Sequence, residues 1–75
     1  MNIYPNPAST AITIETPSKG FLSIHNISGQ QVLQKGITEP KTEIDISTLP
    51  SGVYFVRLTN DKTVEVGKFV KQYIK

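Results

Sequence analysis

Several residue types and patterns that carry chemistry are absent from this sequence. Its 75 residues include no cysteine, which excludes disulfide bonds, thiolate metal sites and a cysteine nucleophile. They include a single histidine, His25, so a transition-metal site would need a mostly oxygen ligand set, and we expect no metal. The formal net charge is +2, with lysines and acids interspersed and no arginine cluster. This charge pattern is too weak to indicate nucleic-acid binding.

Long apolar segments and helical periodicity are missing too. No apolar run approaches the roughly 20 residues of a membrane-spanning helix, and no stretch has an apolar repeat of 3.6 residues. The opening residues, MNIYPNPAST, have neither the basic nor the apolar region of a secretory signal peptide. A chain of this length allows one domain. We therefore expect residues 1–75 to be a single domain excised from a larger protein.

Short runs of alternating apolar and polar residues occupy most of the chain. Such runs, rich in isoleucine, valine, threonine and aromatic residues, are typical of β-strands. They are AITIE, GFLSIHN, QQVLQ, TEIDIS, GVYFVRL and TVEVG with the following KFV. Residues that favour turns separate the runs at regular intervals. The pattern predicts an all-β fold, a small antiparallel β-sandwich of immunoglobulin-like type with about seven short strands.

The alternation also assigns side chains to the two faces of each strand. Phe55 and Arg57 are expected to point outward, and Gly67 is expected to mark a bulge or bend where the last strand changes face. Two sheets packed about 10 Å apart need inward residues from every strand. The predicted core residues are Ile12, Ile14, Leu22, Ile24, Val32, Ile44, Ile46, Leu49, Tyr54, Val56 and Leu58.

No group of residues indicates catalysis. Glu43 and Asp45 share one face of a predicted strand, opposite Ile44 and Ile46. They could act as general acid and base only inside a cleft, and a small sandwich has little room for one. The sequence has no Ser/His/Asp spacing and no glycine-rich phosphate loop. We expect no catalytic residue, no cofactor and no enzymatic activity.

Four blocks of sequence, in this order, resemble a known family. They are IYPNPAST, IHNISGQQV, IDISTLPSGVYFVRL and KFVKQ. Together they are similar to the type A C-terminal sorting domain of the type IX, or Por, secretion system of Bacteroidetes, over Asn2 to about Gln72. The motif positions, to which the resemblance assigns mainly structural roles, are Tyr4, Pro5, Asn6, Pro7, Gly29, Gln30, Asp45, Leu49, Gly52 and Tyr54.

The resemblance implies a non-catalytic module that directs export. Its covalently linked N-terminal passenger would cross the inner membrane by a signal peptide of its own. The type IX translocon of the outer membrane would then recognise the module, and in many members a surface sortase-like protease removes it. The implied destination is the cell surface or the medium of a Gram-negative bacterium, reached through the periplasm and the outer membrane.

The resemblance places recognition in the terminal strand region, at Lys68, Phe69, Val70 and Lys71. A terminal edge strand would leave backbone groups for a receptor to pair with, and the same edge would allow dimerisation. The segment 73–75 extends past KFVKQ. The lysines of this region would keep such an edge from aggregating.

A second hypothesis remains open at this stage. The chain could be an accessory β-sandwich of an extracellular protein that binds carbohydrate or protein, or that serves as a spacer. Such a module would present an exposed aromatic platform, and it would have no required position in its parent chain.

Overall fold

The structure, a computed structural model, describes residues 1–72, in which it has seven β-strands and no helix. The prediction of an all-β fold is therefore confirmed. No helix of residues 1–72 could cross a membrane. The strands are β1 (Asn2–Tyr4), β2 (Ala11–Glu15), β3 (Gly20–His25), β4 (Gln31–Ile37), β5 (Lys41–Asp45), β6 (Gly52–Thr59) and β7 (Val64–Lys71).

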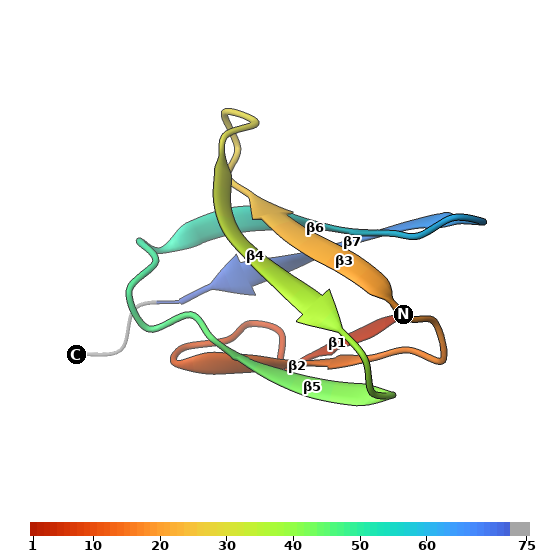
Figure 1. The fold of residues 1–75 in the computed structure, drawn as a ribbon. Coiled ribbons are helices and arrows are strands. Elements are labelled where there is room, and N and C mark those ends of the chain that lie inside the picture. Colours follow the sequence, from red (N-terminus) through yellow and green to blue (C-terminus); the bar gives the residue numbers. More distant parts are fainter. Residues whose placement is uncertain (73–75) are drawn as a thin grey trace.

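Two antiparallel sheets pack face to face as a sandwich (Figure 1). The smaller sheet has the strand order β1-β2-β5, and the larger has the order β4-β3-β6-β7. The last strand, β7, therefore lies at an edge of the larger sheet, as the sequence predicts. It pairs with β6 along its whole length, from Gly52 opposite Lys71 to Thr59 opposite Val64. The tips of the β3–β4 and β6–β7 hairpins project beyond the packed layers (Figure 1).

The core lies between the sheets and follows the predicted alternation. Two of the predicted core residues, Val32 and Leu49, are only partly buried and pack against its rim. The remainder of the predicted set is buried, and the structure adds Ala8, Ile37 and Phe69. The buried apolar residues are Ala8, Ile12, Ile14, Leu22, Ile24, Ile37, Ile44, Ile46, Tyr54, Val56, Leu58 and Phe69.

The first strand was not among the predicted runs. β1 pairs with β2, with Ile3 opposite Ile14, and its three residues are too few for an alternation to stand out. The Pro5–Pro7 segment lies in the connection from β1 to β2. The Tyr4–Pro5 and Asn6–Pro7 peptide bonds are both cis.

The predicted bulge at Gly67 is absent, and that prediction was wrong. The pairing of β6 with β7 continues without a register shift through Val56 opposite Gly67, and Phe69 still points into the core. A Cβ atom at Gly67 would lie 2.8 Å from Cδ1 of Ile3 and 3.4 Å from Cε of Met1. The glycine therefore lets the start of the chain pack against β7, which is a close approach rather than a bend.

Gly20, at the start of β3, occupies the tightest glycine site of the sandwich. A Cβ atom there would collide with the backbone carbonyl oxygen of Thr59 on β6. Gly20→Ala is expected to lower the free energy of unfolding by about 1–3 kcal/mol, because the two strands must separate. Urea unfolding followed by circular dichroism measures this difference.

The matched control for Gly20→Ala is the same substitution on the neighbouring strand β4. A Cβ atom at Gly36 would meet no atom within 4 Å, so Gly36→Ala should change the stability by no more than about 0.5 kcal/mol. Equal effects of the two substitutions would show that the contact with Thr59 is not what requires glycine.

Candidate functional site

The side chains of β7 divide between the core and the surface. Lys68 and Val70 are exposed, whereas Phe69 is fully buried and Lys71 is 5% exposed. The family resemblance grouped these four residues as one recognition segment, but only the side chains of Lys68 and Val70 are exposed. A role of the four in recognition remains a prediction. The extension at 73–75 lies outside the described residues.

Phe69 lies in the core opposite a tyrosine of the family motif. Its ring stacks on that of Tyr54, with the ring centroids 5.4 Å apart and the planes 18° apart. The Tyr54 hydroxyl donates a hydrogen bond to the carbonyl oxygen of Pro50, which satisfies the polar atom of an otherwise apolar, buried side chain. The stacked pair joins the terminal strand to β6 and to the corner before it.

Lys71 reaches across the sandwich to that same corner, between β5 and β6. Its Nζ donates hydrogen bonds to the carbonyl oxygens of Ile46 at 2.8 Å and Leu49 at 2.9 Å, and a longer one to Ser47 at 3.5 Å. A buried ammonium group is tolerated only when acceptors replace the water that it has lost. Lys71 therefore fixes the end of β7 to the three-stranded side of the molecule.

Asp45, a motif position, shapes the start of this corner. Hydrogen bonds from the side chain and the backbone N–H of Ser47 hold the pKa of Asp45 below its usual 3.8, and the nearby positive charge of Lys71 lowers it further. The Ser47 N–H lies 2.8 Å from Oδ1. Asp45 is exposed beside Glu43 on an open sheet surface, where no cleft encloses the pair for acid–base chemistry.

The free edge of β7 is covered at its C-terminal end by the proline-rich segment. The Val70 N–H donates to Oδ1 of Asn6 at 3.0 Å, and the Val70 carbonyl accepts from the Ala8 N–H at 2.8 Å. Backbone groups two residues apart point to the same side of a strand. Those of Lys68 and Val66 therefore face the same edge, and within residues 1–72 the only strand that pairs with β7 is β6.

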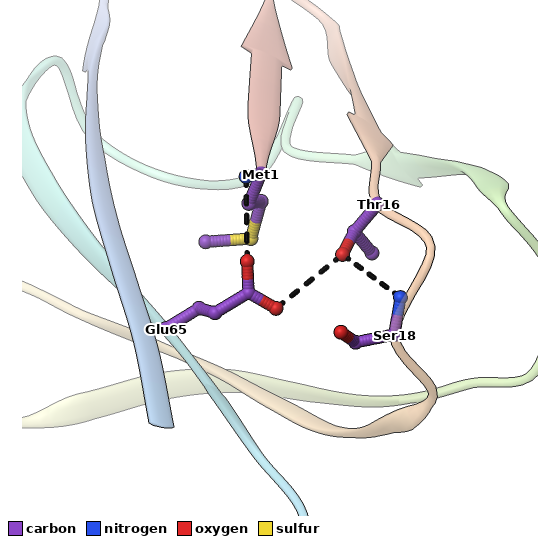
Figure 2. Close-up of polar contacts among 4 residues, drawn as sticks. All are labelled: Met1, Thr16, Ser18 and Glu65. Carbon is purple, nitrogen blue, oxygen red and sulfur yellow. Dashed lines mark hydrogen bonds and ion pairs between the residues drawn. The ribbon is translucent and has the colours of Figure 1, made fainter. Parts of the chain in front are cut away.

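The other end of β7 is held by Glu65, whose partly buried carboxylate points toward Met1 and Thr16 (Figure 2). One of its oxygens accepts from the Thr16 hydroxyl at 3.4 Å, and the other lies 3.4 Å from the backbone nitrogen of Met1. The Thr16 hydroxyl oxygen in turn accepts from the Ser18 N–H at 3.2 Å. Inward side chains thus hold β7 near both ends, whereas its outward side chains are exposed.

The outer face of the larger sheet carries most of the exposed apolar side chains. We define this outer face by its outward residues, which are Phe21, Ser23, His25, Gln31, Gln34, Gly36, Val53, Phe55, Arg57, Thr59, Val64, Val66, Lys68 and Val70. Phe55 and Arg57 point outward as predicted. A groove of about 660 Å³ crosses the face between the β3–β4 turn and β7. His25 lines this groove.

The remaining motif residues lie in turns. Gly29 has a φ of +85° in the β3–β4 turn, where Oδ1 of Asn26 accepts from the N–H groups of Ser28 and Gln30, both at 3.0 Å. Gly52 begins β6 with a φ of +152°. Both conformations favour glycine, so these positions support the fold rather than present a surface.

Two further motif positions are Tyr4, the last residue of β1, and Leu49, in the corner between β5 and β6. The Tyr4 hydroxyl donates to Oε2 of Glu15 at 3.1 Å on the exposed side of the smaller sheet. The Leu49 N–H donates to the carbonyl of Ile46 at 3.0 Å. No group of three or more His, Asp or Glu side chains in the described part of the chain is placed to bind a metal ion.

Comparison with protein families gives a match over nearly the whole chain. A family model described as the secretion system C-terminal sorting domain matches residues 2–72. The matched residues include every motif position and all seven strands. Neither the curated proteins nor the solved structures yielded a match.

Proposed function

The chain belongs to the family of secretion system C-terminal sorting domains, and we propose that its sorting signal is read at the terminal strand β7. Members carry the C-terminal signal for type IX secretion, which delivers proteins through the outer membrane to the cell surface or the extracellular space. The family, the sorting function and the location predicted from the sequence are therefore confirmed. The proposal concerns which surface of the domain the secretion machinery recognises.

The observation that carries the proposal is the position of β7 at an edge, held from inside. Its inward side chains Phe69 and Lys71 fix the strand, while Lys68 and Val70 point outward. A preformed edge strand can add to a sheet of a receptor without a large cost in ordering. The edge from Val64 to Lys68, upstream of the segment that covers Val70, is where such pairing would occur.

The finer features of the function are also proposals. We assign residues 1–75 to one non-catalytic domain, joined through its N-terminal end to the exported passenger. Its proposed partners are the outer-membrane translocon and a surface sortase-like protease that removes the domain. The same open edge of β7 would support a dimer.

An export assay tests the recognition site. A fluorescent protein with an N-terminal signal peptide would carry residues 1–75 at its C-terminus in a Bacteroidetes host. Replacing Lys68 and Val70 together by alanine is expected to lower the surface or medium fluorescence at least about tenfold, which corresponds to about 1.4 kcal/mol of lost binding. The control replaces Lys41 and Glu43 by alanine on the outer side of the smaller sheet, and export should be unchanged.

A simple truncation after Gly67 would be a poorer test. It removes Phe69 and Lys71, which hold the fold, so lost export could reflect unfolding. The paired alanine variants keep both residues, and circular dichroism must show that they remain folded. Equal export of the Lys68/Val70 variant and the control would contradict recognition at these side chains. Periplasmic retention of the unmodified fusion would contradict sorting by residues 1–75.

A further inference from the structure

The two outer faces of the sandwich differ in polarity. An antiparallel sheet with one face in water usually presents polar residues there, and the smaller sheet does so. The larger sheet instead exposes Phe21 by 63%, Phe55 by 46% and Val66 by 72%. Contiguous exposed apolar surface of this kind marks interaction sites.

The charges on this outer face have one sign. Its ionised side chains are Arg57 and Lys68, and no carboxylate of residues 1–72 points out of it. Glu65 on the same sheet points inward. Another acid of this region, Asp61, lies in the turn beyond the ends of β6 and β7.

The cations and the apolar residues are neighbours rather than separate patches. Phe55 lies between His25 and Lys68 across the strands, and Arg57 lies between Ser23 and Val66. Phe55 and Arg57 are two residues apart on β6, so they share the face. The groove of about 660 Å³ is lined by both cations together with Phe55, Val66, His25 and Ile27.

We propose that this outer face docks a protein of the secretion machinery whose contact surface is apolar and bears carboxylates opposite Arg57 and Lys68. Apolar side chains of the partner would pack on Phe55 and Val66, and its carboxylates would pair with the two cations. The inference rests on the proposed function and extends recognition from the edge of β7 to the adjoining sheet face.

A second copy of this chain fits the face less well. Two outer faces brought together would place Arg57 and Lys68 against like charges. The outer side of the smaller sheet offers the acids Glu15, Glu43 and Asp45, but its exposed large apolar side chain is Tyr4 alone. It therefore has little to cover Phe21, Phe55 and the valines.

Site-directed photo-crosslinking in the exporting host tests the contact directly. The fluorescent fusion would carry p-benzoylphenylalanine in place of Phe55, or in place of Glu43 as the control on the opposite sheet. We expect a crosslink from position 55 to a component of the secretion machinery, mapped to a segment that contains Asp or Glu, and none from position 43. A fusion that is exported normally without a crosslink at position 55 would overturn the inference.

Charge reversal at Arg57 tests whether the partner presents negative charge to this face. Arg57→Glu is expected to lower export at least about tenfold, as for a cation at the centre of an interface, whereas Lys41→Glu makes the same charge change elsewhere and should leave export unchanged. Both variants must keep the wild-type circular dichroism spectrum. Wild-type export of Arg57→Glu would contradict the inference.

Two further measurements test whether a membrane or a second copy of the chain, rather than a protein of the machinery, occupies the outer face. Binding of the 75-residue chain to phosphatidylglycerol vesicles, lost in Arg57→Glu, together with no protein crosslink, would assign the face to a membrane instead. A dimer in sedimentation equilibrium that Phe55→Ala dissociates would assign it to a second copy.

The outcomes also separate this inference from the proposed function. Lost export of the Lys68/Val70 variant with normal export of Arg57→Glu would keep recognition at β7 and would remove the β6 part of the face from the contact. Failure of the unmodified fusion to leave the periplasm would overturn both.

Discussion

Phe69→Ala is expected to lower the free energy of unfolding by about 3–5 kcal/mol, as for other buried phenylalanines. Phe69 is fully buried and stacks on Tyr54, so the truncation removes a large apolar side chain and leaves a cavity between the sheets. A domain of this length has a total stability of only about 4–11 kcal/mol. The loss is therefore a large fraction of the total stability, and the unfolded population should rise at growth temperature.

Urea unfolding of the 75-residue chain, followed by circular dichroism, measures the loss. The matched control is Phe55→Ala, which makes the same substitution on the other side of the same sheet, where the side chain is 46% exposed. We expect the control to cost less than about 1 kcal/mol. Similar losses from the two substitutions would contradict the burial of Phe69.

The two phenylalanines should also differ in how they affect export. Phe69→Ala is expected to lower surface delivery because less of the protein is folded, and its spectrum should report this. Phe55→Ala should leave the fold intact, so any loss of export from it would come from a lost contact. Sequence position alone does not distinguish these two roles.

Lys71→Met is the second substitution with a large expected effect. Methionine keeps most of the side-chain length but removes the ammonium that donates to carbonyl oxygens of Ile46, Ser47 and Leu49. Leaving a buried acceptor unpaired costs about 1–3 kcal/mol. The Ile46 oxygen also accepts from the Leu49 N–H, so it keeps one partner, and we expect a net loss of about 2–4 kcal/mol.

The same unfolding experiment measures the effect, and the chain supplies its own control. Lys68→Met replaces an exposed lysine three residues earlier on the same strand and should change the stability by no more than about 0.5 kcal/mol. In the export assay the proposal expects both variants to lose export, Lys68→Met through a lost contact with the partner and Lys71→Met through lost stability. A Lys71→Met variant with the same free energy of unfolding as the wild type would refute the anchoring role.

Most strands, the alternation of apolar and polar side chains along them, and most of the core could be predicted from the sequence. Alternation at a period of two is a local property, so it assigned Ile12, Leu22 and Val56 inward and Phe55 outward without knowledge of the pairing. The positive φ at Gly29 also depends only on residues close in sequence. β1 was missed because three residues carry too little periodicity, and Ile3 becomes recognisable only when it packs against Gly67.

The candidate site was predicted as a segment but not as a surface. The family resemblance located it at Lys68 to Lys71, and the alternation of the last strand contained the signal that Phe69 and Lys71 share a side. The expected change of face at Gly67 obscured that signal. A glycine in a strand indicates either a bulge or a close approach, and only a neighbour distant in sequence decides between them.

The sequence by itself determined that this protein is a small all-β domain of the sorting family, because strand periodicity and family motifs are written in consecutive residues. Only the tertiary structure decided which lysine is an anchor and which is free. Lys71 is buried because the fold brings it to carbonyl groups 22 to 25 residues earlier in the chain. The backbone N–H of Val70 is covered because the fold brings it to Asn6, which lies 64 residues earlier. Such contacts depend on the packing of two sheets, and no local pattern specifies them.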